Sequence, residues 1–369
     1  MSTRTTLLVA VALLTRPRYR RRLTPSAFYI KADLHSLSES QWIRVLSSPR
    51  DDVFINALSM RREPFFRLVE ITEPYLTRGA TGHPNLSPVD VIGLTLMWFT
   101  SRLLQKHLQT MFGQTPAVIC RELQRGRAAL RSALQVDRDG RIEWPDAPTM
   151  QLFSDMVQQK RGELSHVFGF MDGVHFPILN PADVDEQNAY YNGREREVTI
   201  TNVLVFTPDG CIASVRYNCP GSWHDSIVAL PIYDVLNNII LTPPPYRIIA
   251  DSAFVATDRC VTCLTVTQAA SATRAAQQMN AAVVSVRQAA EWGMHSLQSV
   301  FHRLTSPFPC DVAYNQQVLD VAFRLFNFHA RWDGNQTRTV FDPDDVIDNN
   351  SLADLIDQHN RYLIARFNL

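Results

Sequence analysis

The chain has 369 residues, of which 46% are hydrophobic and 20% are charged, so it can bury a sizeable core and is not a disordered protein. Its 36 Lys and Arg balance its 36 Asp and Glu, and this zero net charge argues against a protein that coats DNA. At about 150 residues per domain, the length predicts two or three domains. No stretch approaches about 18 uncharged apolar residues, so we expect neither a membrane span nor a membrane partner.

Residues 1–35 are predicted to be a basic, poorly ordered lead. A short apolar run at residues 6–14 is followed by an arginine cluster that comprises Arg16, Arg18 and residues 20–22. The apolar run resembles a signal-peptide core, but it is short and no small-residue cleavage site follows it. The arginine cluster fits a nuclear-import or DNA-backbone patch and fits a plain basic tail equally well.

A helical pattern runs through residues 36–165. Ser87 is typical of a helix N-cap, and Pro88 after it occupies the first helical position, which proline favours. Apolar residues then recur at helical spacing, at Val91 and Leu94. We therefore expect this part of the chain to be all-helical.

Residues 105–130 have the pattern of a helix-turn-helix. One helix is expected to end at Gly113, and a second is expected to begin at Pro116. The second helix carries four side chains suited to phosphates and base edges, namely Arg121, Gln124, Arg125 and Arg127. We predict that these residues bind DNA, although the bare pattern slightly favours an ordinary helical hairpin with a solvated basic face.

The pattern changes near residue 166, where apolar and β-branched runs replace the helical periodicity. The expected elements are strands at 168–172, 197–206 and 211–217, a helix from Asp225, a strand at 246–250 and a long helical region at 269–304. The first strand is expected to lead into a turn at its Asp-Gly pair, and Thr-Pro-Asp-Gly at 207–210 is expected to close a hairpin. This order is that of an RNase H-like α/β fold, with a mixed central sheet flanked by helices.

Acidic residues stand at the ends of two of these strands. Asp172 ends the first strand and Asp251 follows the fourth, and these two strands lie side by side in an RNase H-like sheet. We therefore expect Asp172 and Asp251 to be neighbours, with Glu291 reaching toward them from a helix packed across the sheet. Acids are costly to bury unless something compensates them, and a pair of divalent cations does so. Because two such ions about 3.5–4 Å apart cut or join phosphodiesters, phosphoryl transfer on nucleic acid is the first hypothesis.

Five short motifs occur in order within roughly residues 80–310. They are Asp-Gly-Val-His-Phe-Pro-Ile at 172–178, Tyr-Asn-Gly-Arg at 191–194, Pro-Gly-Ser-Trp-His-Asp-Ser at 220–226, Ala-Asp-Ser-Ala-Phe at 250–254, and Arg287 with Glu291, Trp292 and Gly293. In this order and spacing the chain resembles the PIF/Harbinger transposases and the nucleases derived from them, in the DDE superfamily.

The resemblance implies a divalent-metal-dependent nuclease. It implies that Asp172, Asp251 and Glu291 are the catalytic acids, that Asp225 joins them as a metal ligand, and that the metal is Mg²⁺ or Mn²⁺. The implied partners are DNA, a Myb-like DNA-binding protein and further copies of the chain in a homo-oligomer. The implied location is the nucleus.

The chain departs from the family pattern at two places. Trp292 and Gly293 directly follow the expected catalytic Glu, where many members carry an aromatic-Gly pair slightly further on and then a Lys. Phe254 stands where a Tyr is common. Neither departure removes a metal ligand, and the missing Lys affects the expected DNA affinity more than the chemistry.

Several residues keep two interpretations. Arg287 lies one helical turn before Glu291, where it can be an ion-pair partner, or can orient the carboxylate or hold DNA. His175 and His224 can contact phosphate or carry protons, but structural roles are favoured. Asp225 can be a metal ligand or an acid at a helix N-terminus.

Cys260 and Cys263 have the only ligand-like spacing among the six cysteines. No second pair and no nearby His pair completes a zinc site. Buried thiols in a reducing compartment are therefore favoured.

Together these patterns predict a metal-dependent DNA endonuclease, a transposase-derived hydrolase that works by a two-metal mechanism. Its nuclease domain is expected at 166–310, after the helical DNA-binding region, and a C-terminal helical extension is expected at 311–369. The alternative is a domesticated transposase that acts as a DNA-binding or adaptor protein without cleavage.

Overall fold

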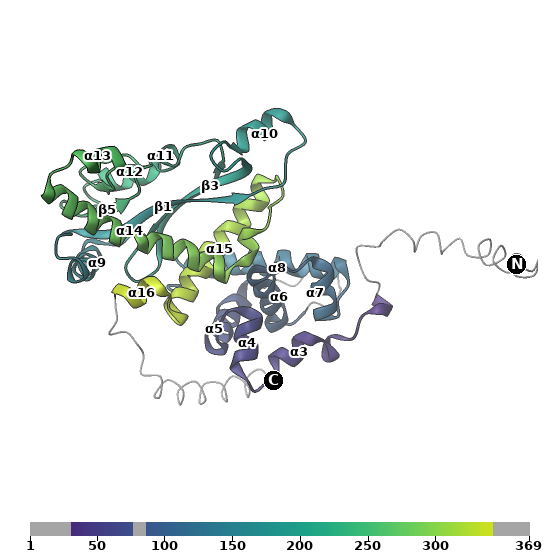
Figure 1. Ribbon diagram of the computed structural model, residues 1–369. Helices are drawn as coiled ribbons and strands as arrows, with labels where there is room; N and C mark the ends of the chain where they lie inside the picture. Colours follow the sequence, from purple (N-terminus) through teal and green to yellow (C-terminus); the bar gives the residue numbers. More distant parts are fainter. Residues whose placement is uncertain (1–30, 77–85, 342–369) are drawn as a thin grey trace, which may run out of the picture. The chain divides into compact units, whose positions relative to one another are not determined.

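The computed structural model describes residues 31–76 and 86–341 (Figure 1). Their chain forms two compact units. The first unit combines the residues up to Leu46 with Leu103–Arg121, and the second combines Ser47–Arg102 with the chain from Glu122 onward. The expected basic lead up to residue 30, with its arginine cluster, lies outside the described residues, and so does the part of the expected C-terminal extension beyond Phe341.

Short helices make up the first unit. They are the 3₁₀ turns η1 (Lys31–Asp33) and η2 (Leu37–Glu39), then α3 (Gln41–Leu46), α7 (Gln105–Phe112) and the start of α8 (Pro116–Val136). The rings of Trp42 and Phe112 stack with their centroids 5.3 Å apart and join α3 to α7. The end of α7 at Gly113 is confirmed, with a φ of +60°, and a side chain there would collide with the backbone oxygen of His35.

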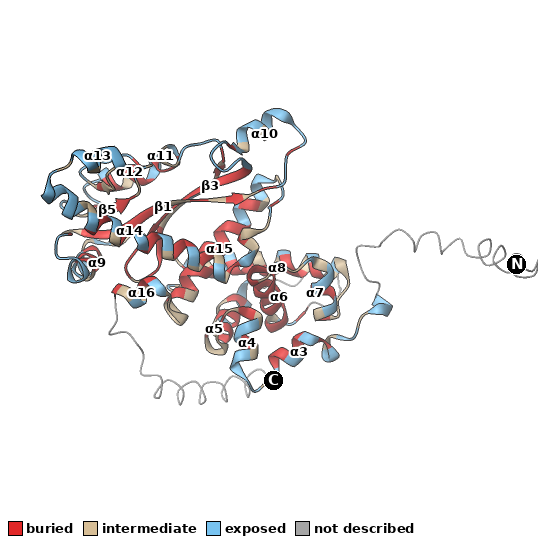
Figure 2. Cartoon of the chain, viewed as in Figure 1, coloured by how far each residue is buried: buried red, intermediate tan, exposed pale blue. Residues whose placement is uncertain are grey.

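The second unit begins with a run of helices, one of which is buried along almost its whole length. In chain order they are α4 (Asp51–Leu58), α5 (Arg62–Thr72), η3 (Glu73–Tyr75), α6 (Pro88–Thr100), the rest of α8, and α9 (Ala147–Lys160). The predicted cap of α6 is confirmed, because the Ser87 hydroxyl accepts a hydrogen bond from the Asp90 N–H. All of α6 after Pro88 is buried (Figure 2). None of the described helices is long and apolar enough to cross a membrane.

A mixed sheet of six strands follows within the described chain. The strands are β1 (Val167–Pro177), β2 (Tyr191–Asn192), β3 (Glu197–Phe206), β4 (Ile212–Pro220), β5 (Arg247–Ala250) and β6 (Cys260–Thr262). The spatial order is β6, β5, β1, β3, and both β2 and β4 pair with β3. β1 is antiparallel to β3 and parallel to β5. The first strand and the strand ending at Ala250 are therefore neighbours, as an RNase H-like order predicts.

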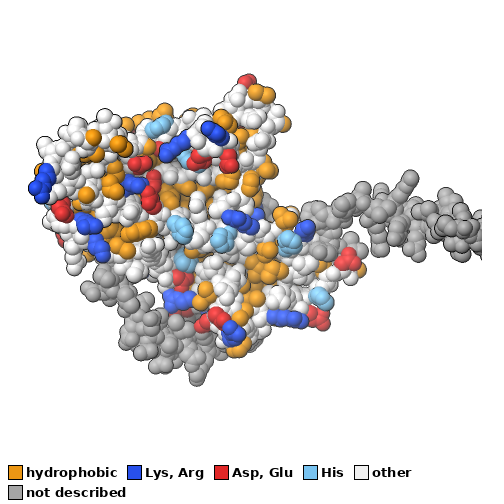
Figure 3. Space-filling model, viewed as in Figure 1, with side chains coloured by type: hydrophobic (Ala, Val, Ile, Leu, Met, Phe, Trp, Pro, Cys, Tyr) orange, Lys and Arg blue, Asp and Glu red, His pale blue; other side chains and the backbone are white. Residues whose placement is uncertain are grey.

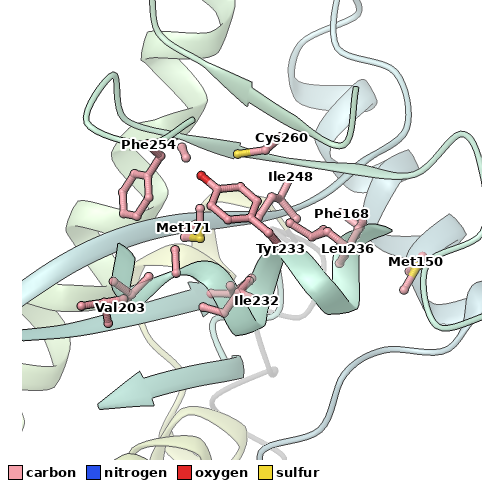
Figure 4. Packing of buried hydrophobic residues seen from close by; sticks show 14 of the residues in the cluster. Met150, Phe168, Met171, Val203, Ile232, Tyr233, Leu236, Ile248, Phe254 and Cys260 are labelled. Carbon is pink, nitrogen blue, oxygen red and sulfur yellow. The ribbon is translucent and has the colours of Figure 1, made fainter. Parts of the chain in front are cut away.

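Helices cover both faces of this sheet. The helices between and after the strands are α10 (Val184–Tyr190), α11 (Asp225–Val228), α12 (Leu230–Asn237), α13 (Val266–Ser271), α14 (Arg274–Val300), η4 (His302–Thr305), α15 (Val312–Asp333) and α16 (Gln336–Phe341). Met171 of β1 packs with Ile232 of α12 on one face (Figure 4). Phe170 stacks on Phe341 of α16 on the other, because successive strand residues point to opposite faces.

β1 continues through the position where a turn was expected. Asp172 pairs with Leu204 and Gly173 pairs with Val203, so the prediction of a turn at this Asp-Gly pair is wrong. The glycine is required for a different reason, because a Cβ at Gly173 would lie 2.7 Å from the carboxylate carbon of Asp225. The predicted hairpin of β3 and β4, by contrast, is confirmed.

Candidate active site

Two acids lie beside each other on neighbouring strands, Asp172 within β1 and Asp251 directly after the end of β5. β1 and β5 run parallel with Met171 opposite Ala250, so Asp172 and Asp251 are the next residues in register. Met171 and Ala250 both belong to the core under α12. Because side chains alternate along a strand, Asp172 faces the opposite side, toward α14, and the charge of Asp251 acts on Asp172 there.

α14 brings an arginine and a third acid to this side of the sheet. The Arg287 Nη2 lies 2.5 Å from the Glu291 Oε1, which confirms the ion pair that the spacing of four residues predicts. The Nη1 of the same guanidinium lies 3.9 Å from the Asp172 Oδ2. One arginine therefore stands between two of the predicted catalytic acids.

The electrostatics of Asp172 reflect this crowding. Burial raises the pKa of Asp172 to about 6, the Gly173 N–H and Arg287 lower it, and the charges of Asp251 and Glu291 raise it further. The Gly173 N–H donates to the Asp172 Oδ1 at 2.8 Å. Asp172 thus senses both of the other acids across the face that α14 covers, and the charge of Arg287 acts against theirs.

A cysteine that the sequence analysis assigned to the core borders this site. β5 and β6 run parallel with Ala250 opposite Thr262, so Cys263 follows β6 as Asp251 follows β5. Burial raises the pKa of the Cys263 thiol, Arg287 lowers it and Asp251 raises it. The strand-end position of Cys263 was the available signal. Its CxxC partner Cys260 is a free, fully buried thiol whose pKa burial raises to about 12.

The structure does not bring Asp225 together with the other acids. Its carboxylate lies against Gly173, which points away from the side on which Asp172 lies. The His175 Nε2 is 3.7 Å from the Asp225 Oδ1, and the His175 Nδ1 is 3.1 Å from the Thr201 hydroxyl. Asp225 begins α11, so its position fits the interpretation as an acid at a helix N-terminus.

His224 has a structural role of the kind that the sequence analysis favoured. It is the N-cap of α11, and its Nδ1 accepts a hydrogen bond from the Ser226 N–H at 3.3 Å. The imidazole therefore takes the place of the usual Ser, Thr, Asn or Asp cap.

Two of the four predicted DNA-binding residues of α8 are used inside the second unit. The Arg125 guanidinium pairs with the fully buried Glu122 at 2.6 Å, and the Arg127 guanidinium lies 5.0 Å from the centre of the Trp98 ring. Gln124 is exposed, and Arg121, which is half-buried, falls in the first unit. On the face drawn in Figure 3, basic side chains are scattered among acidic ones rather than gathered into one patch.

The donor chemistry of the site suits a hard divalent cation, but the donors are not gathered around one point. Carboxylate oxygens are the ligands that Mg²⁺ and Mn²⁺ prefer. Within residues 31–76 and 86–341, no three His, Cys, Asp or Glu side chains are placed to hold one metal ion. The Glu291 Oε1 is held by Arg287, so Glu291 is directed to this guanidinium rather than to a point shared with Asp172 and Asp251.

Comparisons with known proteins connect this region to one superfamily. Residues 171–327 match the family described as DDE superfamily endonuclease, so this segment, less than half of the chain, is a domain of that kind. The match does not distinguish the PIF/Harbinger group. No curated protein is significantly similar to the chain. A chain in the crystal structure of a pre-cleavage Mos1 transpososome is 10% identical, with 72% of this chain and 81% of that chain covered, but its TM-score of 0.24 is too low to carry a conclusion.

Proposed function

We propose that this chain is a divalent-metal-dependent DNA endonuclease in which Asp172, Asp251 and Glu291 hold the metal. The observation that carries the proposal is the position of Asp172 and Asp251 side by side in the register of β1 and β5, with Asp172 facing the helix that presents Glu291. All three acids lie within the segment that matches the DDE superfamily endonucleases, which generally use divalent metals.

Asp172 has the geometry of the principal ligand. One of its oxygens accepts the Gly173 N–H, which fixes the carboxylate and leaves the other oxygen directed toward α14. Asp172 would be the principal ligand of a divalent ion, Asp251 would bind it from the end of the neighbouring strand, and Glu291 would complete the set from α14. A bound divalent ion supplies Lewis acidity to the phosphate and lowers the pKa of the attacking water.

The finer assignments rest on the motifs and are part of the same proposal. The order of the five motifs supports a PIF/Harbinger-type nuclease of transposase origin that acts in the nucleus, with a Myb-like partner and in a homo-oligomer. Asp225 is left out of the ligand set because its carboxylate lies against Gly173. DNA contact through α8 is assigned first to the exposed Gln124, with Arg121, Arg125 and Arg127 as secondary contacts.

Cleavage of supercoiled plasmid with Mg²⁺ or Mn²⁺ tests the proposal. Asp172→Asn keeps the size of the side chain and removes its charge, so the cleavage rate should fall at least about 100-fold. Loss of a residue that only hydrogen-bonds to a metal ligand usually costs less than this. Asp234→Asn on the exposed side of α12 is the matched control and should cleave like the wild type. Equal cleavage by wild type and Asp172→Asn would show that the site lies elsewhere.

The adaptor alternative has one observation in its favour, the commitment of Glu291 to Arg287. A domesticated transposase that no longer cleaves has no need of a free third ligand. A wild-type protein that neither cleaves DNA nor gains thermal stability from Mg²⁺ or Mn²⁺, yet retains DNA, would establish this alternative instead.

A further inference from the structure

Arg287 occupies the place in the acid cluster where positive charge is needed. Its guanidinium reaches Glu291 at 2.5 Å and Asp172 at 3.9 Å, with one nitrogen directed to each. The side chain is only 19% exposed, whereas Glu291 is 50% exposed. Arg287 is therefore held within the site, and Glu291 is the partner that can swing toward solvent.

The charge of Arg287 acts on every acid of the site. Burial lowers the pKa of Arg287, but Glu291, Asp172 and Asp251 outweigh burial, and the net pKa lies above its ordinary value. A buried guanidinium keeps its charge when it is paired in this way. Without a metal, this single cation offsets part of the repulsion among three carboxylates.

We propose that Arg287 is the resident counter-cation of the acid cluster and competes with the divalent ion for Glu291 and Asp172. The inference rests on the proposed function, because it concerns the same three acids. The guanidinium already holds the Glu291 Oε1, and its positive charge would lie beside any ion that Glu291 shares with Asp172 and Asp251. Metal loading therefore has to overcome the pairing and the repulsive charge of Arg287, which raises the metal concentration that loading requires.

Calorimetric titration of the full chain with Mn²⁺ measures this competition. Arg287→Met removes the charge and keeps the aliphatic stem, so Mn²⁺ should bind at least about fivefold more tightly, the low end of ordinary coupling between two ligands. Arg287→Lys keeps the charge and should bind Mn²⁺ with close to the wild-type affinity. Weaker binding by Arg287→Met would mean that Arg287 instead orients Glu291 for the ion, and unchanged binding would mean that the two are not coupled; either result overturns the proposal.

Arg324→Met is the matched control. Arg324 pairs with Asp320 four residues before it at 3.0 Å and is 15% exposed, so it resembles Arg287 in spacing and burial. It makes none of the contacts of the acid cluster. Its loss should lower the melting temperature and leave the affinity for Mn²⁺ unchanged, which separates general destabilisation from the specific effect.

A thermal double-mutant cycle tests the counter-cation role without any metal. Arg287→Met should lower the melting temperature of the metal-free protein, and Asp172→Asn in the same chain should recover most of the loss, since the uncompensated acid is then gone. Additive effects would overturn the role of Arg287. If the wild type cleaves DNA and Arg287→Met binds Mn²⁺ no more tightly than the wild type, this inference alone is refuted. If neither the wild type nor Arg287→Met binds Mn²⁺, the inference and the proposed function are both refuted.

Discussion

Burial raises the pKa of Asp172 to about 6 from an ordinary value of 3.8, although the Gly173 N–H and Arg287 act in the opposite direction. A carboxyl group with a higher pKa in the folded state binds its proton more tightly there than in the unfolded chain. The folded state therefore loses stability as the pH rises from about 4 to about 6, and the loss is complete above that range. The charge on which metal binding depends thus destabilises the metal-free fold.

Asp172→Asn should stabilise the metal-free protein at pH 8 by about 1–3 kcal/mol, because a difference of one pKa unit corresponds to about 1.4 kcal/mol and the side chain is partly solvated. At pH 4 the gain should nearly vanish. Thermal melts of wild type and variant in chelator at both pH values check this. Mn²⁺ should raise the melting temperature of the wild type and leave that of the variant unchanged. Equal melting temperatures at pH 8 in chelator would contradict the burial of charge at Asp172.

Gly173→Ala should destabilise the protein by about 1–3 kcal/mol, the usual cost of inserting a methyl group into a packed site. The new Cβ would lie 2.7 Å from the Asp225 carboxylate carbon. Urea unfolding measures the loss, and Gly162→Ala, where no atom lies within 4 Å, is the control. Shortening Asp225 to Ser in the Gly173→Ala chain should restore part of the stability. No restoration would mean that the strain arises from the strand backbone.

Elements defined by local signals could be predicted from the sequence. Ser87 with Pro88, Gly113 and the Thr-Pro-Asp-Gly turn each mark a boundary that depends only on nearby residues, and the structure has these boundaries. Nearby residues could not show that the chain stays extended at Asp172, because the group that requires Gly173 is the carboxylate of Asp225, far along the chain. The Asp-Gly pair, which is typical of turns, is here part of a strand, and its glycine leaves room for the Asp225 carboxylate.

The candidate site shows the same division between local and distant information. The strand order predicts that Asp172 and Asp251 are neighbours, since each comes directly after one of two residues, Met171 and Ala250, that pair in β1 and β5. The side of the sheet on which Asp225 lies depends on where α11 packs, and no local pattern carries that information. The contact of Arg287 with Asp172 likewise depends on how α14 lies across the sheet, whereas its contact with Glu291 follows from helical spacing alone.

α8 makes a testable distinction between structural and DNA-binding residues. Arg125 faces Glu122, which is fully buried, so Arg125→Ala should cost about 3 kcal/mol because a buried carboxylate loses its facing charge. Gln124→Ala should leave stability unchanged, since Gln124 is exposed. Urea denaturation gives the stabilities, and retention on DNA-agarose against salt gives the affinities. Weaker retention is expected for Gln124→Ala, and a Gln124→Ala protein with wild-type retention would place the DNA contact away from this part of α8.

The second unit depends on contacts between α15, which covers the sheet, and the helices that precede it in the chain. The His329 Nε2 of α15 donates to the backbone oxygen of Ser59 at the end of α4, at 2.9 Å, and lies 3.6 Å from Asp333. Burial lowers the pKa of His329, Asp333 and the Ser59 carbonyl raise it, and Arg61 lowers it, so the net pKa lies below its ordinary value of 6.5. The neutral imidazole is thus the form that joins these helices.

His329→Gln should flatten the loss of stability that accompanies acidification. A histidine with a lowered pKa binds fewer protons in the folded chain than in the unfolded one, so its contribution is present above pH 6.5 and is lost as the pH falls below that value. Glutamine retains a donor for the Ser59 carbonyl and does not titrate, so at pH 7.5 the variant should lose little stability. Chemical denaturation of wild type and variant at pH 7.5 and 5.5 gives the comparison. The other histidines are common to both chains, so they contribute equally to the two pH dependences. If the wild type loses no more stability between pH 7.5 and 5.5 than His329→Gln does, this contact does not link the stability of the second unit to pH.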